Sequence, residues 1–379
     1  MNTLQPQKCG PVAPARVLLA NPRGFCAGVR RAIDAVESAL DRHGAPVYVR
    51  RAIVHNRDVV ERLERLGAVF VQDIEAIPEG SITILSAHGS SRGVRQSADA
   101  RRLRVVDAIC PLVAKVHAEV EAWYRAGRHV ILIGHAGHPE VIGTLGQVPA
   151  GAISIVSQAG DLDGLDLPSN SAVAYAVQTT FAMRDAEALI AAVEARFADV
   201  ARPRASDICY ATTNRQAAIE GIAAQCDLVL VVGDEMSSNA RRLVEVARAA
   251  GCREAVLIAG AAALPLDKVL SASTIGLTAA ASTPENAITR VCLTLRELGC
   301  TLIENAGSTE RVRFKPVDLD ALAHQHRQDR SMTGWRNCAV PSIPRWKLRS
   351  GRCAGATGAC GKRCAIPQLA AASAFAPCW

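Results

Sequence analysis

Apolar residues along this chain come in short continuous runs that alternate with stretches of helical periodicity. Runs such as HVILIG (129–134) and DLVLVV (227–232) are typical of strands that are buried on both faces. Stretches such as AGVRRAIDAVESAL (27–40) and PLVAKVHAEVEAWYRAG (111–127) place apolar residues three or four apart, which predicts amphipathic helices. Their regular alternation predicts an α/β fold with mainly parallel sheets covered by helices.

The alternation of strands and helices occurs three times, and a cysteine at the start of a helix marks each repeat. Cys26, Cys110 and Cys209 are 84 and 99 residues apart, which is the size of a small α/β lobe. We therefore predict three lobes related by a pseudo-threefold axis, at residues 16–110, 111–208 and 209–317. Residues 1–15 are predicted to form an N-terminal extension, and residues 318–379 a basic, cysteine-rich tail that is poorly ordered.

Polar residues follow the predicted strands at matching positions in the three lobes. They are His55-Asn56, His88, His138 with Glu140, Thr179-Thr180, Ser237-Ser238-Asn239 and Ser282. Ligands of parallel sheets bind at the carboxyl ends of strands, so a pseudo-threefold fold would direct these loops and the cysteines into one central cavity. The simpler alternative is three independent domains whose loops are polar because loops usually are, but the matching positions favour the shared cavity.

Charge is distributed unevenly, and this excludes some partners. The formal net charge is +7, yet the first 320 residues carry 34 basic and 35 acidic side chains, while the remainder carries nine basic and one acidic. The neutral body gives no indication of a nucleic-acid surface. No run of 18 apolar residues exists, so we expect no membrane span, and we expect a cytoplasmic protein because no secretory signal is recognisable.

Three thiols at helix N-termini indicate a metal centre. Helix N-termini favour the thiolate form, and thiolates bind metals. Three of them leave one coordination position open, which fits zinc with a water ligand or an iron–sulfur cluster with one free iron. The neutral donors in the loops suit a phosphate or diphosphate. Glu140 is the only carboxylate in the six loop motifs and could donate a proton.

These residues leave three functions open. One is an iron–sulfur enzyme whose free iron binds a substrate that carries a phosphate or diphosphate. Another is a zinc-dependent hydrolase or lyase that acts on a phosphorylated small molecule, and the third is a non-catalytic, cluster-binding sensor. A nicotinamide-binding Rossmann fingerprint is excluded because no two glycines are spaced as G-x-G.

Several long motifs resemble those of the LytB family, the 4-hydroxy-3-methylbut-2-enyl diphosphate reductases of the non-mevalonate isoprenoid pathway. They lie between about Arg16 and Pro316, in the order that the family has them. The motifs are PRGFCAGVRRAI, VHN (54–56), SAHGSS, DAICPLVAKVH, IGHAGHPEVIGTLGQ, QTT, DICYATTNRQ, VVGDEMSSN and TAAASTPE.

The resemblance implies one [4Fe–4S] cluster per chain at the centre of three α/β lobes, with Cys26, Cys110 and Cys209 as its ligands. It also implies reduction of the allylic diphosphate to isopentenyl and dimethylallyl diphosphate, with ferredoxin or flavodoxin as electron donor. His138, Thr179 and Glu140 would organise the hydroxyl end, with Glu140 relaying the proton. The diphosphate would be held by His55, His88, Ser237, Asn239 and Ser282, with Ser238 adjacent.

The chain departs from the family pattern at three places. Ala280 stands where the family often has glycine, and an added methyl there is expected to crowd the diphosphate. Asp234 and Glu235 stand where Ser and Lys are common, and two carboxylates near an anion site are expected to weaken its binding unless they point away. Ile142 replaces a frequent Glu.

Overall fold

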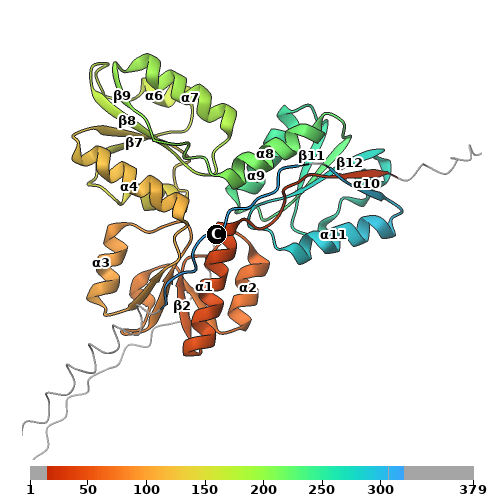
Figure 1. Cartoon of the computed structure of the whole chain (residues 1–379), viewed down its shortest axis with the longest axis horizontal. Coiled ribbons are helices and arrows are strands. Elements are labelled where there is room, and N and C mark those ends of the chain that lie inside the picture. The colour runs from red at the N-terminus through yellow and green to blue at the C-terminus, as the bar shows by residue number, and fades with distance from the viewer. Residues whose placement is uncertain (1–14, 306, 320–379) are drawn as a thin grey trace, which may run out of the picture. The chain divides into compact units, whose positions relative to one another are not determined.

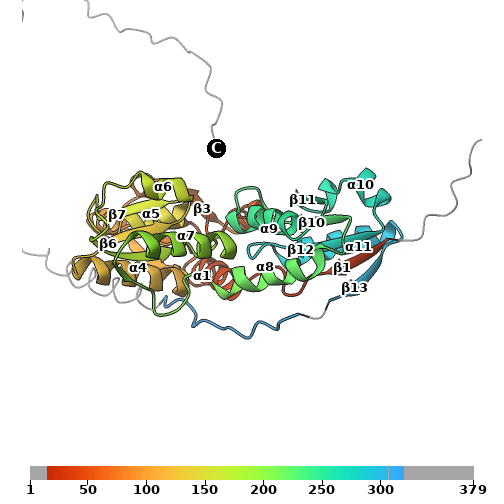
Figure 2. The same ribbon diagram turned by 90° about the horizontal axis from the view of Figure 1, so that it is seen from above.

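A computed structural model describes residues 15–305 and 307–319, which belong to one compact unit. Its thirteen strands form three sheets in which every pairing is parallel. The predicted α/β class is therefore confirmed. Figure 1 shows the three groups of strands and helices, and Figure 2 shows the same groups from above. Apart from residues 15, 318 and 319, the predicted extension and tail lie outside the described residues.

The first lobe contains a four-stranded sheet in the order β3-β2-β4-β5. Its strands are β2 (Val47–Arg50), β3 (Ala68–Val71), β4 (Ile82–Leu85) and β5 (Arg104–Asp107), and its helices are α1 (Ala27–His43), α2 (Arg57–Arg65), α3 (Arg92–Ala100) and the short η1 (Ile74–Ala76). Residues of α1 and α2 pack on one face of the sheet, and those of η1 and α3 on the other.

The second lobe has the same plan, with the order β7-β6-β8-β9. Its strands are β6 (His129–Ile133), β7 (Ile153–Val156), β8 (Ala172–Val177) and β9 (Asp199–Ala201), and its helices are α4 (Pro111–Arg125), α5 (Pro139–Leu145), α6 (Ala159–Asp163) and α7 (Met183–Arg196). Here α4 and α5 cover one face, and α6 and α7 the other.

The third lobe contains five strands in the order β11-β10-β12-β1-β13. The strands are β10 (Leu228–Val232), β11 (Glu254–Ile258), β12 (Thr274–Ala279), β13 (Thr301–Glu304) and β1 (Arg16–Leu19), and the helices are α8 (Tyr210–Ala223), α9 (Ser238–Ala249), α10 (Leu266–Ser271), α11 (Glu285–Glu297) and the short η2 (Ala261–Ala263). Residues of α10 and α11 pack on one face, and those of α8 and α9 on the other.

The position of β1 differs from the prediction that residues 16–110 form one lobe. This strand pairs with β12 and β13 of the third sheet, with Val17 in register with Ile275 and Leu302. It occupies the place that β5 and β9 have in the other sheets, and all three strands lead to a cysteine. The third lobe is therefore completed by the beginning of the described chain.

The segment after β13 runs without helix or strand from the third lobe to the first, and we call residues 307–319 the strap. It is drawn in blue along the lower edge of Figure 2. The Arg31 side chain on α1 donates a hydrogen bond to the carbonyl oxygen of Lys315 (2.8 Å), and Leu319 is buried in the core of the first lobe. None of the described helices combines the length and apolar character that crossing a membrane requires.

Candidate active site at the carboxyl ends of three sheets

Each of the three cysteines directly precedes a helix, and its backbone is hydrogen-bonded to the loop that follows a neighbouring strand. Cys26, Cys110 and Cys209 are the N-cap residues of α1, α4 and α8. Their backbone N–H groups donate to the carbonyl oxygens of Ala281 (3.2 Å), Ala87 (3.0 Å) and Thr179 (3.1 Å), which lie just after β12, β4 and β8. The same contact therefore brings a cysteine beside a polar loop in every lobe.

One cavity of about 120 Å³ contains all of the predicted site residues, and we call it the cysteine cavity. The sequence-predicted residues in its lining are Cys26, Cys110, Cys209, His55, His88, His138, Glu140, Thr179, Ser237, Ser238, Asn239 and Ser282. The loops of all three lobes contribute to it, as a shared central cavity requires and three independent domains do not.

The thiols differ from the expectation of lowered pKa values. Burial raises the pKa of Cys26, and it raises the pKa of Cys110 to about 12 and that of Cys209 to about 11. Backbone N–H groups at the helix starts act in the predicted direction and lower these values, but desolvation is the larger effect. A metal that binds here has to displace protons from the sulfurs, so its binding is coupled to proton release.

Three cysteine thiols that line one cavity fit a cluster with one free iron as well as a zinc ion with one open position. A Cβ atom at Gly28 would lie 2.8 Å from the sulfur of Cys110 and 3.8 Å from that of Cys26, so this glycine keeps open the space beside both sulfurs. Among residues 15–305 and 307–319, no three His, Cys, Asp or Glu side chains are arranged to hold one ion.

Three histidine rings face one another on the other side of the cavity. The ring centroids of His55 and His88 are 4.1 Å apart, and those of His55 and His138 are 5.7 Å apart. Burial lowers the pKa of His55 to about 4 and that of His138 to about 3, and it lowers the pKa of His88 well below the usual value. The rings also repel charge on one another, so they are neutral donors and acceptors at neutral pH.

Several polar atoms in and around these rings have no hydrogen-bond partner among the residues that the structure describes. Both ring nitrogens of His55 and both amide atoms of Asn239 are buried without a hydrogen bond. Ser237 caps α9, and the hydroxyl of Ser282 donates to the carbonyl oxygen of His55 (3.0 Å) and lies 3.4 Å from the hydroxyl of Ser237. Buried polar groups are normally satisfied, so this set indicates a polar ligand, and a helix N-terminus favours an anion.

Glu140 is buried beside the cysteines, and its carboxyl group is hydrogen-bonded to Thr179, which follows strand β8. Its carboxyl group is 3% exposed and accepts hydrogen bonds from the backbone N–H of Thr179 (2.6 Å) and from its hydroxyl (2.8 Å). Burial raises the pKa of Glu140 to about 7, although both hydrogen bonds lower it. A carboxyl group with this pKa can hold and release a proton near neutral pH.

Sequence reasoning missed four residues that support this site, which are Thr212, Arg215, Glu310 and Tyr210. Thr212 contacts the sulfur of Cys209 (3.2 Å) and donates to the carbonyl oxygen of Thr179. Arg215 is fully buried, donates to the carbonyl oxygen of Gly24 (2.6 Å) and pairs with Glu310 of the strap (2.8 Å). The hydroxyl of Tyr210 accepts the N–H of Ala27 (3.1 Å). Thr212, Tyr210 and Arg215 lie within the motif DICYATTNRQ, so the resemblance of this motif to the family could have identified them as site residues.

The departures from the family pattern lie outside the cavity lining. Asp234 accepts the backbone N–H groups of Arg57 (3.0 Å) and Met236 (2.9 Å), so it joins the third lobe to the start of α2. Ala280 is buried, and Ile142 is 38% exposed. None of these side chains lines the cavity, but the charge of Asp234 acts on the His55 ring and raises its pKa against the larger effect of burial, so the expected repulsion of an anion stays a prediction.

The fold and the site define a class of proteins in which three parallel α/β sheets share one thiol-lined cavity. The chain belongs to the LytB family, whose model, described as LytB protein, matches residues 17–296. Members of this family use an iron–sulfur cluster.

Curated relatives match most of the chain. A 4-hydroxy-3-methylbut-2-enyl diphosphate reductase of Burkholderia pseudomallei (strain 1026b) is 49% identical over 301 residues, which are 79% of this chain and 96% of the relative. One from Bordetella pertussis (strain Tohama I) is 51% identical over 303 residues, with 80% and 93% covered. These relatives are oxidoreductases by name.

Two solved structures resemble this one. The E-1-hydroxy-2-methyl-but-2-enyl-4-diphosphate reductase from Plasmodium falciparum has a TM-score of 0.79 and 37% identity, and the match covers 84% of this chain and all of that one. An (E)-4-hydroxy-3-methyl-but-2-enyl diphosphate reductase, described as the terminal enzyme of the non-mevalonate pathway, has a TM-score of 0.55 and 30% identity, with 75% and 99% covered.

Proposed function

We propose that this protein reduces (E)-4-hydroxy-3-methylbut-2-enyl diphosphate to isopentenyl and dimethylallyl diphosphate, the last step of the non-mevalonate pathway. The observation that carries the proposal is the cysteine cavity, where three thiols, unpartnered donors for an anion and a buried carboxyl group lie together. The 49–51% identity to curated reductases over nearly their whole length supports the substrate assignment.

The proposed cofactor is one [4Fe–4S] cluster per chain, held by Cys26, Cys110 and Cys209. The use of an iron–sulfur cluster by the LytB family supports this choice over zinc. When bound, such a cluster supplies one-electron reduction and a free metal position for the oxygen of the substrate.

His55, His88, Ser237, Asn239 and Ser282 are proposed to bind the diphosphate, with Ser238 adjacent. The unpartnered atoms of His55 and Asn239 offer hydrogen bonds that a diphosphate can accept or complete. Ser237 is the N-cap of α9, so the positive end of that helix faces the same ligand. The remainder of the substrate then extends toward the cysteines.

Glu140 is the proposed proton donor at the hydroxyl end of the substrate. Overall, two electrons and two protons enter, the allylic C–O bond breaks, and the oxygen leaves as water. Glu140 holds one proton at its carboxyl group, and the two hydrogen bonds from Thr179 fix the direction of that group. His138 precedes the helix that carries Glu140 and accepts the N–H of that residue through Nδ1 (3.2 Å), which ties the ring to the same end.

Ferredoxin or flavodoxin is the proposed electron donor, because the reaction needs single electrons from outside the chain. A cytoplasmic location is also proposed, because the cysteines form no disulfides among the residues that the structure describes. All seven cysteines that the structure describes are free thiols, as is usual in a reducing compartment.

Anaerobic purification followed by iron, sulfide and zinc analysis tests the proposal. We expect about four irons and four sulfides per chain, and turnover of the allylic diphosphate with reduced methyl viologen. Cys110→Ser should lose most of the iron and all turnover, whereas Cys300→Ser, at a buried cysteine outside the cavity, should keep both. A colourless protein with stoichiometric zinc would overturn the proposal in favour of a hydrolase, and a cluster without turnover in favour of a sensor.

A further inference from the structure

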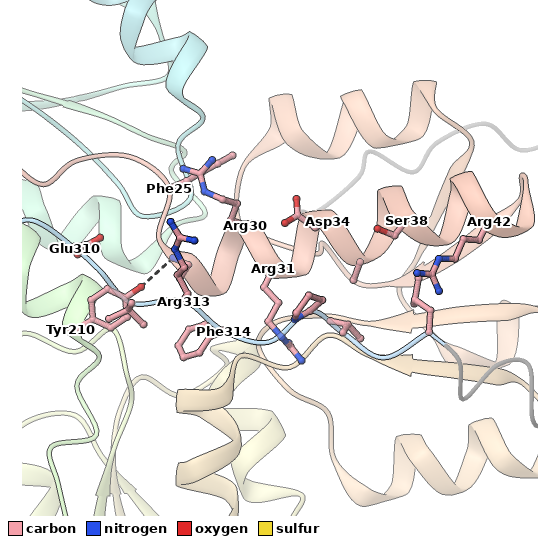
Figure 3. Close-up of a pocket in the computed structure, with 16 residues that line it drawn as sticks. Phe25, Arg30, Arg31, Asp34, Ser38, Arg42, Tyr210, Glu310, Arg313 and Phe314 are labelled. Atoms are coloured by element: carbon pink, nitrogen blue, oxygen red, sulfur yellow. Dashed lines mark hydrogen bonds between the residues drawn. The ribbon is translucent and has the colours of Figure 1, made fainter.

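A second hollow lies on the other side of the cysteines, and we call it the strap groove. Its volume is about 530 Å³, and it is formed by α1, Tyr210 and the strap. Figure 3 shows Phe25, Arg30, Tyr210 and Arg313 together at one end of it. None of the proposed substrate-binding residues lines it, so it is a separate approach to the molecule.

The wall between the strap groove and the cysteine cavity is one residue thick. Along the start of α1, Phe25 and Ala27 line the groove, whereas Cys26 and Gly28 line the cavity. Tyr210 lines the groove, whereas its neighbours Cys209 and Ala211 line the cavity. The hydrogen bond from the N–H of Ala27 to the hydroxyl of Tyr210 (3.1 Å) closes this wall. A molecule in the groove therefore comes close to two of the three cysteines without entering the substrate site.

The rim of the strap groove is basic. Arg30 on α1 and Arg313 on the strap line the groove and are exposed, and Arg311 and Lys315 are exposed elsewhere on the strap; none of the four forms an ion pair within residues 15–305 and 307–319. Two carboxylates also line the groove. Glu310 pairs with the buried Arg215, and Asp34 is exposed. The positive charge of the rim is therefore only partly balanced.

Two-electron reduction with single-electron steps needs a donor that can act while substrate is bound. A donor that entered through the cysteine cavity would compete with the diphosphate for the same space. The strap groove avoids this conflict because its lining and that of the cavity share no residue. Electron transfer becomes much slower with distance, so the thin wall beside Cys26 and Cys209 is a favourable place for it.

We propose that the strap groove is the docking site of a small acidic electron-transfer protein, which passes electrons across the wall formed by Phe25, Ala27 and Tyr210. This inference rests on the proposed function. At each docking the reduced donor would lose one electron, which a cluster held by Cys26, Cys110 and Cys209 would accept, so that two dockings supply the two electrons of one turnover. The chain's own residues 321–379 are a poor occupant because they carry nine basic side chains and one acidic, the same sign as the rim.

The test compares charge variants in two assays and one binding measurement. Arg30→Glu/Arg313→Glu reverses two charges that line the groove. Arg30→Gln/Arg313→Gln removes both charges without reversing them, and is the milder change. Arg65→Glu/Arg253→Glu is the matched control, because both arginines are exposed, lack an ion pair among the described residues and do not line the groove. Binding of oxidised flavodoxin is measured by calorimetry, and turnover is driven either by reduced flavodoxin or by reduced methyl viologen.

The reversal should weaken flavodoxin binding and raise the KM for flavodoxin by about tenfold or more, while the neutral variant should lie between it and the wild type. Viologen-driven turnover and the iron content should stay at the wild-type values. Wild-type binding should weaken when the salt concentration rises from 50 to 500 mM, because the Debye length shrinks from above 10 Å to below 8 Å.

Each outcome separates the docking proposal from the proposed function. Equal flavodoxin binding in the groove variants and the wild type, or an equal loss in the control, overturns the docking site. Failure of the wild type with viologen overturns the proposed function, and the flavodoxin binding constants still decide the docking question. A variant that fails to fold is recognised by its melting temperature, and the neutral variant then gives the answer.

Discussion

At the residue scale, Glu140 depends on Thr179 for its protonation. Burial favours the neutral carboxyl group, and the two hydrogen bonds from Thr179 favour the carboxylate, which leaves the pKa at about 7. The effects are opposed, so losing one hydrogen bond changes the pH at which Glu140 carries a proton. This makes the pH profile of turnover a direct measure of the pair.

Thr179→Val removes the hydroxyl hydrogen bond and keeps the backbone one. Because the lost bond stabilises the ionised form, the pKa of Glu140 should rise by about one unit. A donor must be protonated, so turnover falls as pH rises through this pKa, and in the variant that alkaline limb should move to higher pH. The pH profile of kcat, recorded from pH 5 to 9, measures this shift of the alkaline limb. Thr180→Val, which lacks a hydrogen bond to Glu140, is the control, and an equal shift there would contradict the pairing.

Gly28 can be tested without measuring turnover. In Gly28→Ala the added methyl would lie 2.8 Å from the sulfur of Cys110, so we expect most of the cluster iron to be lost while the protein still folds. Gly221→Ala on α8 is the matched control, because nothing lies within 4 Å of its Cβ position. It should keep its iron and gain up to about 1 kcal/mol of stability, as a helical glycine replaced by alanine does. Full iron in Gly28→Ala would show that the space is not needed.

At the element scale, the strap holds the Cys26 loop through one ion pair. Arg215 on α8 is fully buried, and its guanidinium contacts both Glu310 of the strap and the carbonyl oxygen of Gly24, two residues before Cys26. A buried charge that loses its partner is costly, whereas an exposed pair contributes little. The chain offers a comparison, because Arg23 and Glu304 form a similar pair in which Glu304 is 63% exposed.

Glu310→Gln should lower the free energy of unfolding by about 2–4 kcal/mol because it leaves Arg215 without its countercharge. Glu304→Gln should lower it by less than about 1 kcal/mol. Urea unfolding of both variants measures the difference. Faster loss of iron to a chelator in Glu310→Gln is also expected, since the Cys26 loop is held less firmly. Equal stabilities would mean that the strap pair does not hold this loop.

The elements were largely predictable from the sequence, but the position of one strand was not. The apolar runs correctly identified strands such as β6 and β10, since strands buried on both faces need such runs. The short β1 fits any of the sheets equally well, so the apolar pattern could not assign it. At Cys110, a strand ends one lobe and the cysteine begins the next. If the strand before Cys26 likewise completes a lobe other than the one that this cysteine begins, β1 belongs to the third lobe, as the structure shows.

The strap and its contacts were harder to predict than the cavity. The cavity residues follow strands at repeated positions, so the sequence pattern alone is enough to place them together. Glu310 and Arg215 are 95 residues apart, and nothing in their spacing indicates a contact. Their pairing depends on the path of an irregular segment, which hydrophobic periodicity does not describe.

At the scale of the whole molecule, the proposed anion site draws its ligands from the first and third lobes, and the second lobe places the His138 ring beside them. His55 and His88 follow strands of the first sheet, His138 follows a strand of the second, and Ser237, Asn239 and Ser282 follow strands of the third. Anion binding therefore contributes contacts that no single lobe has. A ligand present at 100 times its dissociation constant stabilises the folded state by about 2.7 kcal/mol.

Pyrophosphate should bind with proton uptake. Without an anion, burial holds the pKa of His55 at about 4, and burial together with charge repulsion from His55 holds that of His138 at about 3, so these rings are neutral at pH 6. A bound anion raises these values, so protons are taken up wherever the pH lies between the free and bound pKa, and affinity falls as pH rises through the bound pKa. Calorimetry at pH 6 in two buffers of different ionisation enthalpy counts the protons. Pyrophosphate also titrates, so His88→Asn is the control: it should bind with fewer protons and show a smaller rise in melting temperature. An unchanged proton count in that variant would place the anion away from the histidine rings.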